Sequence, residues 1–235
     1  ITVLTKLAER QIEQGKFEEA YNIWATIYHL DNSNAKALFG LGQYELEINH
    51  NAEAAVSFFA LISIPSADVF EGLAIAYKIL GDYDQALGYI DYALSLDFNI
   101  DTALSKINIL EAAQNYSLIP SVYGQILDLM PNNGGFLYEY AKSLSRADEY
   151  NEADSVFEQA FNILEQEMEL ETSVYRPYIE NSIDAGQFEK AVELANKCIQ
   201  NDSNQDVLLH ELKAKALAAL GNIEVISLYF TIGNN

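Results

Sequence analysis

The feature that most constrains this fold is a short turn-forming motif that recurs along the chain at a nearly constant interval. Each copy places Gly, Asn or Asp between two apolar stretches. Gly ends a helix in the left-handed conformation at little cost, and Asn and Asp come next. The spacing therefore predicts helical hairpins, each turn joining two antiparallel helices. The motif is marked by Gly15, Asn49, Gly81, Asn115, Asp148, Gly186 and Gly221, at steps of 34, 32, 34, 33, 38 and 35 residues.

The stretches between the turns have the pattern of packed helices. Apolar residues recur at three- and four-residue spacing, and the chain has only four prolines, which favours helix nearly throughout. A small residue five positions after the turn lets two helix backbones approach closely, and a large apolar residue one turn later fills the space between hairpins. The small residues are Ala20, Ala54, Ala86, Ala153 and Ala191, and the large ones are Trp24, Phe58, Ile90 and Phe157.

The first helices of four repeats carry a large residue, two spacers, and then a large and a small residue. Examples are Leu4-Leu7-Ala8, Leu38-Leu41-Gly42, Phe70-Leu73-Ala74-Tyr77 and Leu137-Tyr140-Ala141-Leu144. With this pattern and period the chain resembles the tetratricopeptide-repeat family. The resemblance implies an all-α fold, a right-handed α-solenoid (superhelix) of about seven helix-turn-helix repeats. We expect one array over residues 1–235, with repeats at about 1–34, 35–66, 67–99, 100–133, 134–171 and 172–206 and a truncated repeat at 207–235.

Two repeats depart from the pattern. The fourth has Pro120 where the small residue is expected, and it needs a one-residue shift between its two helices. Because proline is tolerated in the first turn of a helix, Pro120 is expected to begin its helix late. The fifth has about four extra residues near 165–171, which predict a helix longer by one turn.

Charge and motifs exclude several classes of function. The chain has 13 Lys and Arg against 35 Asp and Glu, a formal charge of -22 that repels phosphate backbones and anionic lipid. Its three histidines have no His or Cys at ligand spacing, and neither a phosphate-binding glycine loop nor a catalytic nucleophile motif is present. We expect no enzyme activity, no catalytic residue, no metal and no cofactor. The expected partner is a protein or peptide, with no nucleic acid and no membrane insertion.

The sequence also bears on the cellular compartment. The single cysteine, Cys198, has no partner for an intramolecular disulfide and lies on an apolar helical face. The first residues lack the pattern of a signal peptide, and no apolar run is long enough to cross a bilayer. A cytoplasmic protein is expected. Because the chain begins without Met, it is interpreted as an excised or processed piece, and whether the parent protein has a targeting signal stays open.

Repeat arrays of this kind bind partners on the concave surface formed by their first helices. Ten of the 13 basic residues lie on predicted first helices, which favours a groove with cationic donors and apolar anchors. The alternative, that these are solvated charges paired with local acids, stays open. The predicted function is a non-enzymatic scaffold or adaptor that binds a peptide or protein segment in this groove. The candidate groove residues are Lys36, Phe39, Gln43, Glu71, Lys78, Lys106, Ile109, Tyr138, Lys142, Arg146 and Arg176.

Two other classes of function stay open. The chain is interpreted alternatively as a regulatory or sensor segment of a larger multidomain protein, or as an assembly module that uses terminal and convex surfaces. The apolar C-terminal stretch predicts self-association through Val225, Leu228 and Phe230, or continuation into further repeats. Most tyrosines at hairpin packing positions are expected in the core: Tyr77, Tyr83, Tyr116, Tyr123 and Tyr150. Four others are expected to be freer to face the groove: Tyr44, Tyr138, Tyr175 and Tyr178.

Overall fold

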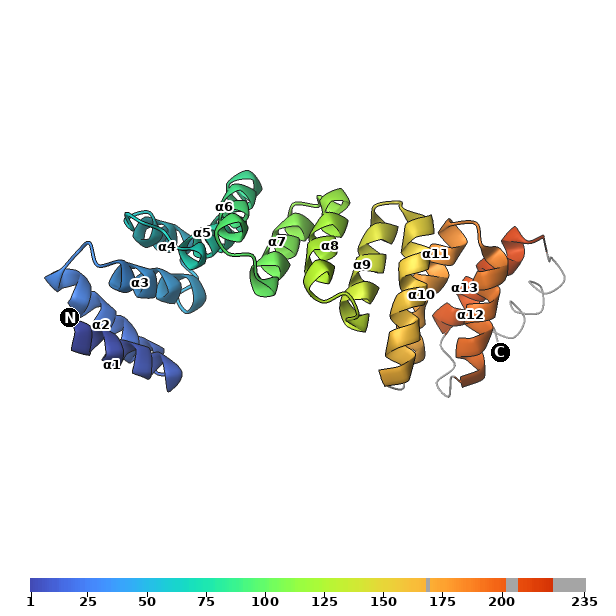
Figure 1. Cartoon of the computed structure of the whole chain (residues 1–235), viewed down its shortest axis with the longest axis horizontal. Helices are drawn as coiled ribbons and strands as arrows, with labels where there is room; N and C mark the ends of the chain where they lie inside the picture. The colour runs from blue at the N-terminus through green and yellow to red at the C-terminus, as the bar shows by residue number, and fades with distance from the viewer. Residues whose placement is uncertain (168–169, 202–206, 222–235) are drawn as a thin grey trace. The chain divides into compact units, whose positions relative to one another are not determined.

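The computed structural model describes residues 1–167, 170–201 and 207–221 (Figure 1). Across those residues the chain forms thirteen α-helices, two short 3-10 helices and no β-strand. The prediction of an all-α solenoid of helical hairpins is confirmed. Its right-handed superhelical sense and its single array over residues 1–235 stay predictions. The predicted contact surface of Val225, Leu228 and Phe230 lies outside the described residues.

The chain divides into two compact units, unit 1 (Ile1–Asn115) and unit 2 (Tyr116–Asn235). Unit 1 contains α1 (Thr2–Glu13), α2 (Phe17–Leu30), α3 (Ala35–Glu47), α4 (Ala52–Phe59), α5 (Ala67–Ile79), α6 (Tyr83–Leu96) and α7 (Ile100–Ala112). Unit 2 contains η1 (Tyr116–Leu118), α8 (Ile119–Leu129), α9 (Gly134–Arg146), α10 (Tyr150–Glu167), η2 (Thr172–Tyr175), α11 (Arg176–Asp184), α12 (Phe188–Asn201) and α13 (Val207–Ala219).

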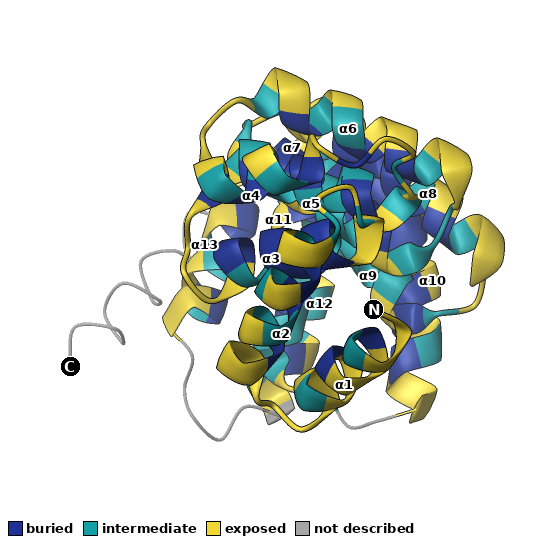
Figure 2. Cartoon of the chain, turned by 90° about the vertical axis from the view of Figure 1, so that its left-hand side faces the viewer, coloured by how far each residue is buried: buried dark blue, intermediate teal, exposed yellow. Residues whose placement is uncertain are grey.

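Within each unit, each helix packs on the helices next to it in the chain, and first helices of successive hairpins also touch. In unit 1, α3 contacts α5 and α5 contacts α7. In unit 2, α9 contacts α11 and α11 contacts α13. Individual helices carry buried residues on one side and exposed residues on another (Figure 2). Each unit therefore has a side on which its first helices lie next to one another.

The hairpin corners lie where the sequence predicts them, but at two corners a different residue adopts the left-handed conformation. His50 and Gln114 hold positive φ angles of 53° and 56°, in place of the expected Asn49 and Asn115. The following helix fixes the register of the second corner, because Asn51 accepts a hydrogen bond from the Ala54 N–H as its N-cap. The other corners turn at Gly15, Gly81, Asp148, Gly186 and Gly221.

Both departures from the repeat pattern have the predicted effect on helices. Pro120 lies in the first turn of α8, preceded by the 3-10 turn η1, so this helix does begin late. Helix α10 has 18 residues, against 14 in each of its counterparts α2, α6 and α12. The extra residues of the fifth repeat therefore lengthen its second helix.

Two aromatic rings in unit 1 fill spaces that glycines leave open. Phe59 is 1% exposed and lies against both Gly42 of α3 and Gly72 of α5. A Cβ atom added at Gly42 would lie 2.5 Å from this ring, and one at Gly72 would lie 2.8 Å from it. Trp24 stands in the same relation to Gly40, where an added Cβ would lie 2.4 Å from the indole nitrogen. Close packing between these hairpins thus depends on the absence of side chains at the three glycines.

The core of unit 2 is built around stacked aromatic rings. Phe161 stacks on Tyr175 at a centroid distance of 4.5 Å and on Tyr178 at 5.4 Å, and Phe157 stacks on Tyr178 at 5.0 Å. Tyr175 and Tyr178 are only 8% and 3% exposed, so the prediction that they face the groove is wrong. Tyr116, expected in the core, is 39% exposed. Cys198 is buried, as its apolar neighbours in the sequence indicate.

Candidate functional site

The candidate site of unit 1 is the side where α1, α3, α5 and α7 lie next to one another, which we call the unit 1 first-helix face. Lys36 on α3 donates a hydrogen bond from Nζ to Oε1 of Glu9 on α1 at 2.8 Å. Both side chains remain largely exposed, at 67% and 46%. The structure therefore places Lys36 where two first helices meet, accessible to a partner.

Two more polar contacts join α5 to α7 on this face. Glu71 accepts hydrogen bonds from the hydroxyls of Thr102 at 3.0 Å and Ser105 at 2.7 Å. Two turns further along α5, Lys78 donates a hydrogen bond to Oδ1 of Asn108 at 3.3 Å. The sequence predicted Glu71 and Lys78 but missed Thr102 and Asn108. Their signal is a spacing of 31 and 30 residues, about one repeat, from the groups that they contact.

Phe39 and Gln43 complete the predicted set on α3. The half-buried Phe39 ring lies 5.9 Å from Phe59, so part of it contributes to the core. Gln43 is partly exposed and follows Lys36 by seven residues, which places the two on the same side of the helix. Phe39 is thus a packing residue that stays partly accessible, and Gln43 is a partly accessible amide.

Two predicted groove residues on α7 point elsewhere. Ile109 is 1% exposed and packs in a core with Ala74 and Ile90, so that prediction is wrong. Its side chain faces the preceding hairpin, against which α7 packs. Lys106 forms an ion pair at 2.7 Å with Asp91 of α6. Its side chain therefore lies on the part of α7 that faces a second helix.

In unit 2, Tyr138 of α9 connects two repeats. Its hydroxyl donates to the main-chain oxygen of Val174 in η2 at 3.0 Å, and its ring packs edge-on against Phe157 and Phe161. Desolvation by burial raises the pKa of Tyr138 to about 12, with smaller contributions from the nearby charges of Glu139 and Glu180. Tyr138 is therefore a neutral, half-buried packing residue whose hydroxyl is already bonded.

The predicted cations of unit 2 lie along α9 and at the start of α11. Lys142 donates to both carboxylate oxygens of Glu139, at 2.8 and 2.9 Å, and its Nζ lies 5.1 Å from the Tyr138 ring centroid. Arg146 is exposed at the end of α9, and Arg176 is half-buried at the first position of α11. Helices α9, α11 and α13 form the unit 2 first-helix face.

These contacts define what the two faces offer to a partner. Each of Lys36, Lys78 and Lys142 already has an oxygen partner, so an incoming carboxylate or carbonyl must exchange with Glu9, Asn108 or Glu139. An exposed ion pair such as Lys36–Glu9 contributes only about 0–1 kcal/mol, so exchange of that partner has a small cost. The unit 1 first-helix face therefore presents exchangeable donors and acceptors from successive repeats, and the unit 2 first-helix face presents the Lys142–Glu139 pair of α9.

Two further ion pairs join α10 to α12, and the sequence pattern predicted neither. Lys190 donates to Oδ2 of Asp154 at 2.8 Å, and Lys197 donates to Oε1 of Glu165 at 2.7 Å. Desolvation opposes both charges, yet the hydrogen bonds with Asp154 and Tyr178 raise the pKa of Lys190. Likewise the bonds from Lys197 and Tyr175 lower the pKa of Glu165 against its desolvation. These pairs hold successive second helices together.

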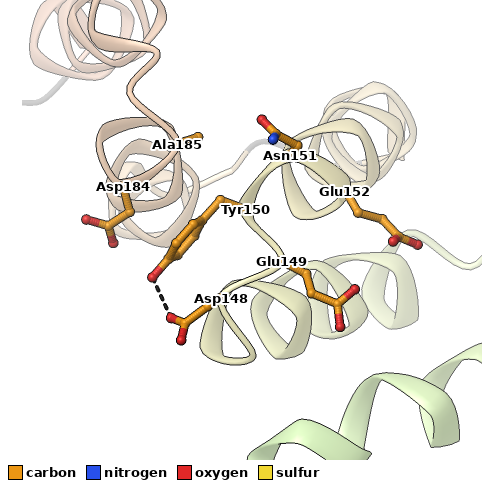
Figure 3. A pocket seen from close by; sticks show the side chains of 7 residues that line it. All are labelled: Asp148, Glu149, Tyr150, Asn151, Glu152, Asp184 and Ala185. Carbon is orange, nitrogen blue, oxygen red and sulfur yellow. Dashed lines mark hydrogen bonds between the residues drawn. The ribbon is translucent and has the colours of Figure 1, made fainter.

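An open hollow of about 300 Å³ lies in unit 2 between the α9–α10 corner and the end of α11 (Figure 3). Glu149, Glu152 and Asp184 line it with side chains that point in different directions, and the Tyr150 hydroxyl donates to Asp148. Asn151 and Ala185 complete its lining. Nowhere in the part of the chain that the structure describes do His, Cys, Asp and Glu residues group so as to hold a metal ion.

No helix among the described residues combines the length and apolar character that a membrane span requires.

Solved structures with the same arrangement of hairpins are similar over most of the chain. The C-terminal part of a repeat-containing protein from Cytophaga hutchinsonii matches with a TM-score of 0.70 and 14% identity, over 98% of this chain and 89% of that one. A tetratricopeptide-repeat protein from Parabacteroides merdae matches with a TM-score of 0.53 and 16% identity, over 92% and 84%. The chain has the tetratricopeptide-repeat fold.

A region of similar fold also occurs in a much longer neighbour. A structure described as Naa15/Naa10 bound to HypK-THB matches with a TM-score of 0.72 and 12% identity, over 98% of this chain but 36% of the matched chain. No protein-family model matches this sequence, and no curated protein matches it. At these identities the similarity to other tetratricopeptide-repeat structures is one of fold.

Proposed function

We propose that this chain is a scaffold without catalytic activity that binds a segment of a partner protein on its first-helix faces. The observation that carries the proposal is the meeting of polar side chains from successive first helices on one side of unit 1. In unit 1 these are Lys36 with Glu9, Glu71 with Ser105, and Lys78 with Asn108. A partner that lies across this face contacts exchangeable groups on every first helix.

The spacing of the helices sets how many residues of an extended partner each first helix contacts. Packed helices lie about 8–10 Å apart, and an extended peptide advances about 3.3 Å per residue. Each first helix of unit 1 would therefore contact about three residues of an extended partner. Lys36 and Lys78 donate to its carboxylates or main-chain oxygens, and Gln43 offers both a donor and an acceptor. The accessible part of Phe39 contacts an apolar side chain.

The fold and the charge both favour a protein as the partner. The fold neighbour described as Naa15/Naa10 bound to HypK-THB is a complex between proteins. The formal charge of -22 disfavours nucleic acids and anionic lipid surfaces. Lys142, Arg146 and Arg176 are proposed to supply the corresponding cationic groups in unit 2.

A charge-reversal experiment tests the unit 1 face. The double variant Lys36→Glu, Lys78→Glu reverses two cations on the face, and the control Lys16→Glu makes the same change at the exposed α1–α2 corner. Proteins captured from an extract of the source cells are compared for both variants and the parent. We expect the double variant to lose a partner that Lys16→Glu keeps. Equal capture by all three proteins would contradict the unit 1 face as the binding surface.

Photo-crosslinking then locates the contact. A crosslinking amino acid placed at Gln43 lies on the first-helix face, and one placed at Asp84 lies exposed on the second helix α6. The captured partner is expected to crosslink from position 43 and not from position 84. Crosslinking from position 84 alone would assign binding to a second-helix surface instead.

A further inference from the structure

Unit 1 has a second accessible surface that the proposed function does not use. It lies at the end of the α5–α6 hairpin, where the segment after α4 leads into α5. Ile64 is 88% exposed, Tyr92 is 63% exposed and Leu96 is 60% exposed. The Tyr92 ring stacks on the half-buried ring of Phe70 at 5.6 Å, and Leu96 follows Tyr92 by one helical turn on α6. Phe70 lies in the first turn of α5, so the end of α6 lies beside the start of α5, which Ile64 precedes by three residues. We call Ile64, Phe70, Tyr92 and Leu96 the α5–α6 patch.

A row of stacked rings supports this patch. Tyr77 stacks on Tyr89 at 5.4 Å, Tyr89 stacks on Phe70 at 6.2 Å, and Phe70 stacks on Tyr92. The row runs between α5 and α6 and ends at the exposed Tyr92. Because stacking already restricts these rings, contact with a partner costs them little conformational entropy, and exposed, pre-ordered tyrosines are typical binding anchors.

The charge around the patch is strongly negative. From residue 37 to residue 105 the chain carries ten Asp and Glu and a single Lys or Arg, Lys78. Three of these acids adjoin the patch in the sequence: the exposed Asp68 and Asp97, and Asp91, whose side chain is 58% exposed beside its ion pair with Lys106. The field at the patch therefore attracts cations and repels phosphate groups. This disfavours anionic lipid and nucleic acid as occupants of an apolar surface.

We propose that the α5–α6 patch docks a polypeptide segment that carries aliphatic side chains next to Lys or Arg. The aliphatic groups cover Ile64, Tyr92 and Leu96, and the basic groups approach Asp68 and Asp97. This contact uses residues other than those of the first-helix face, so the two surfaces can be occupied and tested independently.

Binding of defined peptides to the full chain tests the chemistry of the partner. The probe is a fluorescent synthetic peptide with Leu on one side of a helix and Lys on the other, compared with a Leu/Glu and a Ser/Lys peptide of the same length. Fluorescence anisotropy is measured at about 0.15 M salt, where the Debye length is about 8 Å and long-range attraction is screened. We expect binding of the Leu/Lys peptide and at least tenfold weaker binding of the other two, since each loses either the charge or the apolar contact. Absence of Leu/Lys binding, or equal binding of Ser/Lys, would overturn the proposal.

Matched variants locate the site of binding. Ile64→Ser with Leu96→Ser removes two exposed apolar side chains from the patch. The control pair is Leu30→Ser with Leu129→Ser, at positions that are 65% and 58% exposed at the ends of α2 and α8. All four positions are exposed, so the helical content by circular dichroism should match the parent. We expect the patch pair to weaken Leu/Lys binding by about tenfold or more and the control pair to leave it unchanged. Equal effects of the two pairs would refute this location.

The first-helix variant separates this proposal from the proposed function. Lys36→Glu with Lys78→Glu should leave binding of the Leu/Lys peptide at the patch essentially unchanged. A loss of peptide binding in that variant would show that the peptide occupies the first-helix face, and would overturn the patch as its site.

Discussion

Adding a single methyl group at Gly42 tests how tightly the hairpins of unit 1 pack. Gly42 lies in α3 against the ring of Phe59, and an added Cβ would approach that ring to 2.5 Å. The ring is 1% exposed and is bounded on another side by Gly72, where an added Cβ would lie at 2.8 Å. Phe59 therefore has no free space into which it can move when Gly42 is replaced by Ala.

The same substitution at Gly88 supplies a matched control. Gly88 lies inside α6 with nothing within 4 Å of an added Cβ, so Gly88→Ala gains only helix propensity, about 1 kcal/mol. Gly42→Ala makes the same gain but overpacks the core, which costs about 1–3 kcal/mol. We therefore expect the free energy of unfolding of Gly42→Ala to be lower than that of Gly88→Ala by about 1–3 kcal/mol.

Urea titration followed by the fluorescence of Trp24 measures this difference. Trp24 is the single tryptophan of the chain, is 4% exposed and lies in unit 1, so its emission reports the unfolding of that unit. A smaller side chain at position 59 should relieve the clash. Phe59→Leu is accordingly expected to cost about 1 kcal/mol less beside Ala at position 42 than beside Gly. Equal stability of the two Gly→Ala variants, or equal costs of Phe59→Leu, would refute the reasoning.

Three other predictions concern corners, ion pairs and pH. Replacing His50 or Gln114 by Gly should raise the free energy of unfolding by about 1 kcal/mol each in urea titrations, because both hold left-handed backbone angles. Lys190→Met should lower the free energy of unfolding by about 2 kcal/mol, between the values for exposed and buried ion pairs, because its partner Asp154 is 8% exposed. The loss should be smaller when Lys190→Met is made in an Asp154→Asn background. Because the folded-state pKa of Tyr138 is about 12, its stabilisation is present below pH 10 and lost as pH rises toward 12. Tyr138→Phe should lower the free energy of unfolding by about 1 kcal/mol near neutral pH. Above pH 10, the free energy of unfolding of this variant should fall less steeply than that of the parent. An unchanged alkaline slope in Tyr138→Phe would contradict that assignment.

The sequence predicts the repeat and much of the core because both follow from periodic residue types. Ala20 and Trp24 are buried as their positions in the repeat indicate. The corners at His50 and Gln114 were displaced by one residue from the prediction. Preference for the left-handed conformation is worth only about 1 kcal/mol between residues, less than the packing and capping that fix where each helix ends.

The candidate site was predictable where the phase of a helix is regular. Glu71 and Lys78 lie two turns apart on α5 and share one side, as a period of 3.6 residues requires. Ile109 was misplaced in the fourth repeat, whose sequence pattern is shifted by one residue before Pro120, and a shift of one residue turns a side chain by about 100°. Asn108 was missed because its contact with Lys78 depends on how two repeats pack, which the pattern within one repeat does not contain.

The bonds between repeats have a consequence for how each unit folds. Lys78 with Asn108, Glu71 with Ser105, Tyr138 with Val174 and Lys190 with Asp154 join residues only 30, 34, 36 and 36 positions apart. Forming such contacts closes only short loops, and chains with a low contact order fold quickly. A hairpin that has formed offers the next one a complete template, so folding can spread outward from any repeat in a unit. Because each repeat contacts only its neighbours, a whole repeat can be gained or lost during evolution with compensating substitutions only at the two adjoining surfaces.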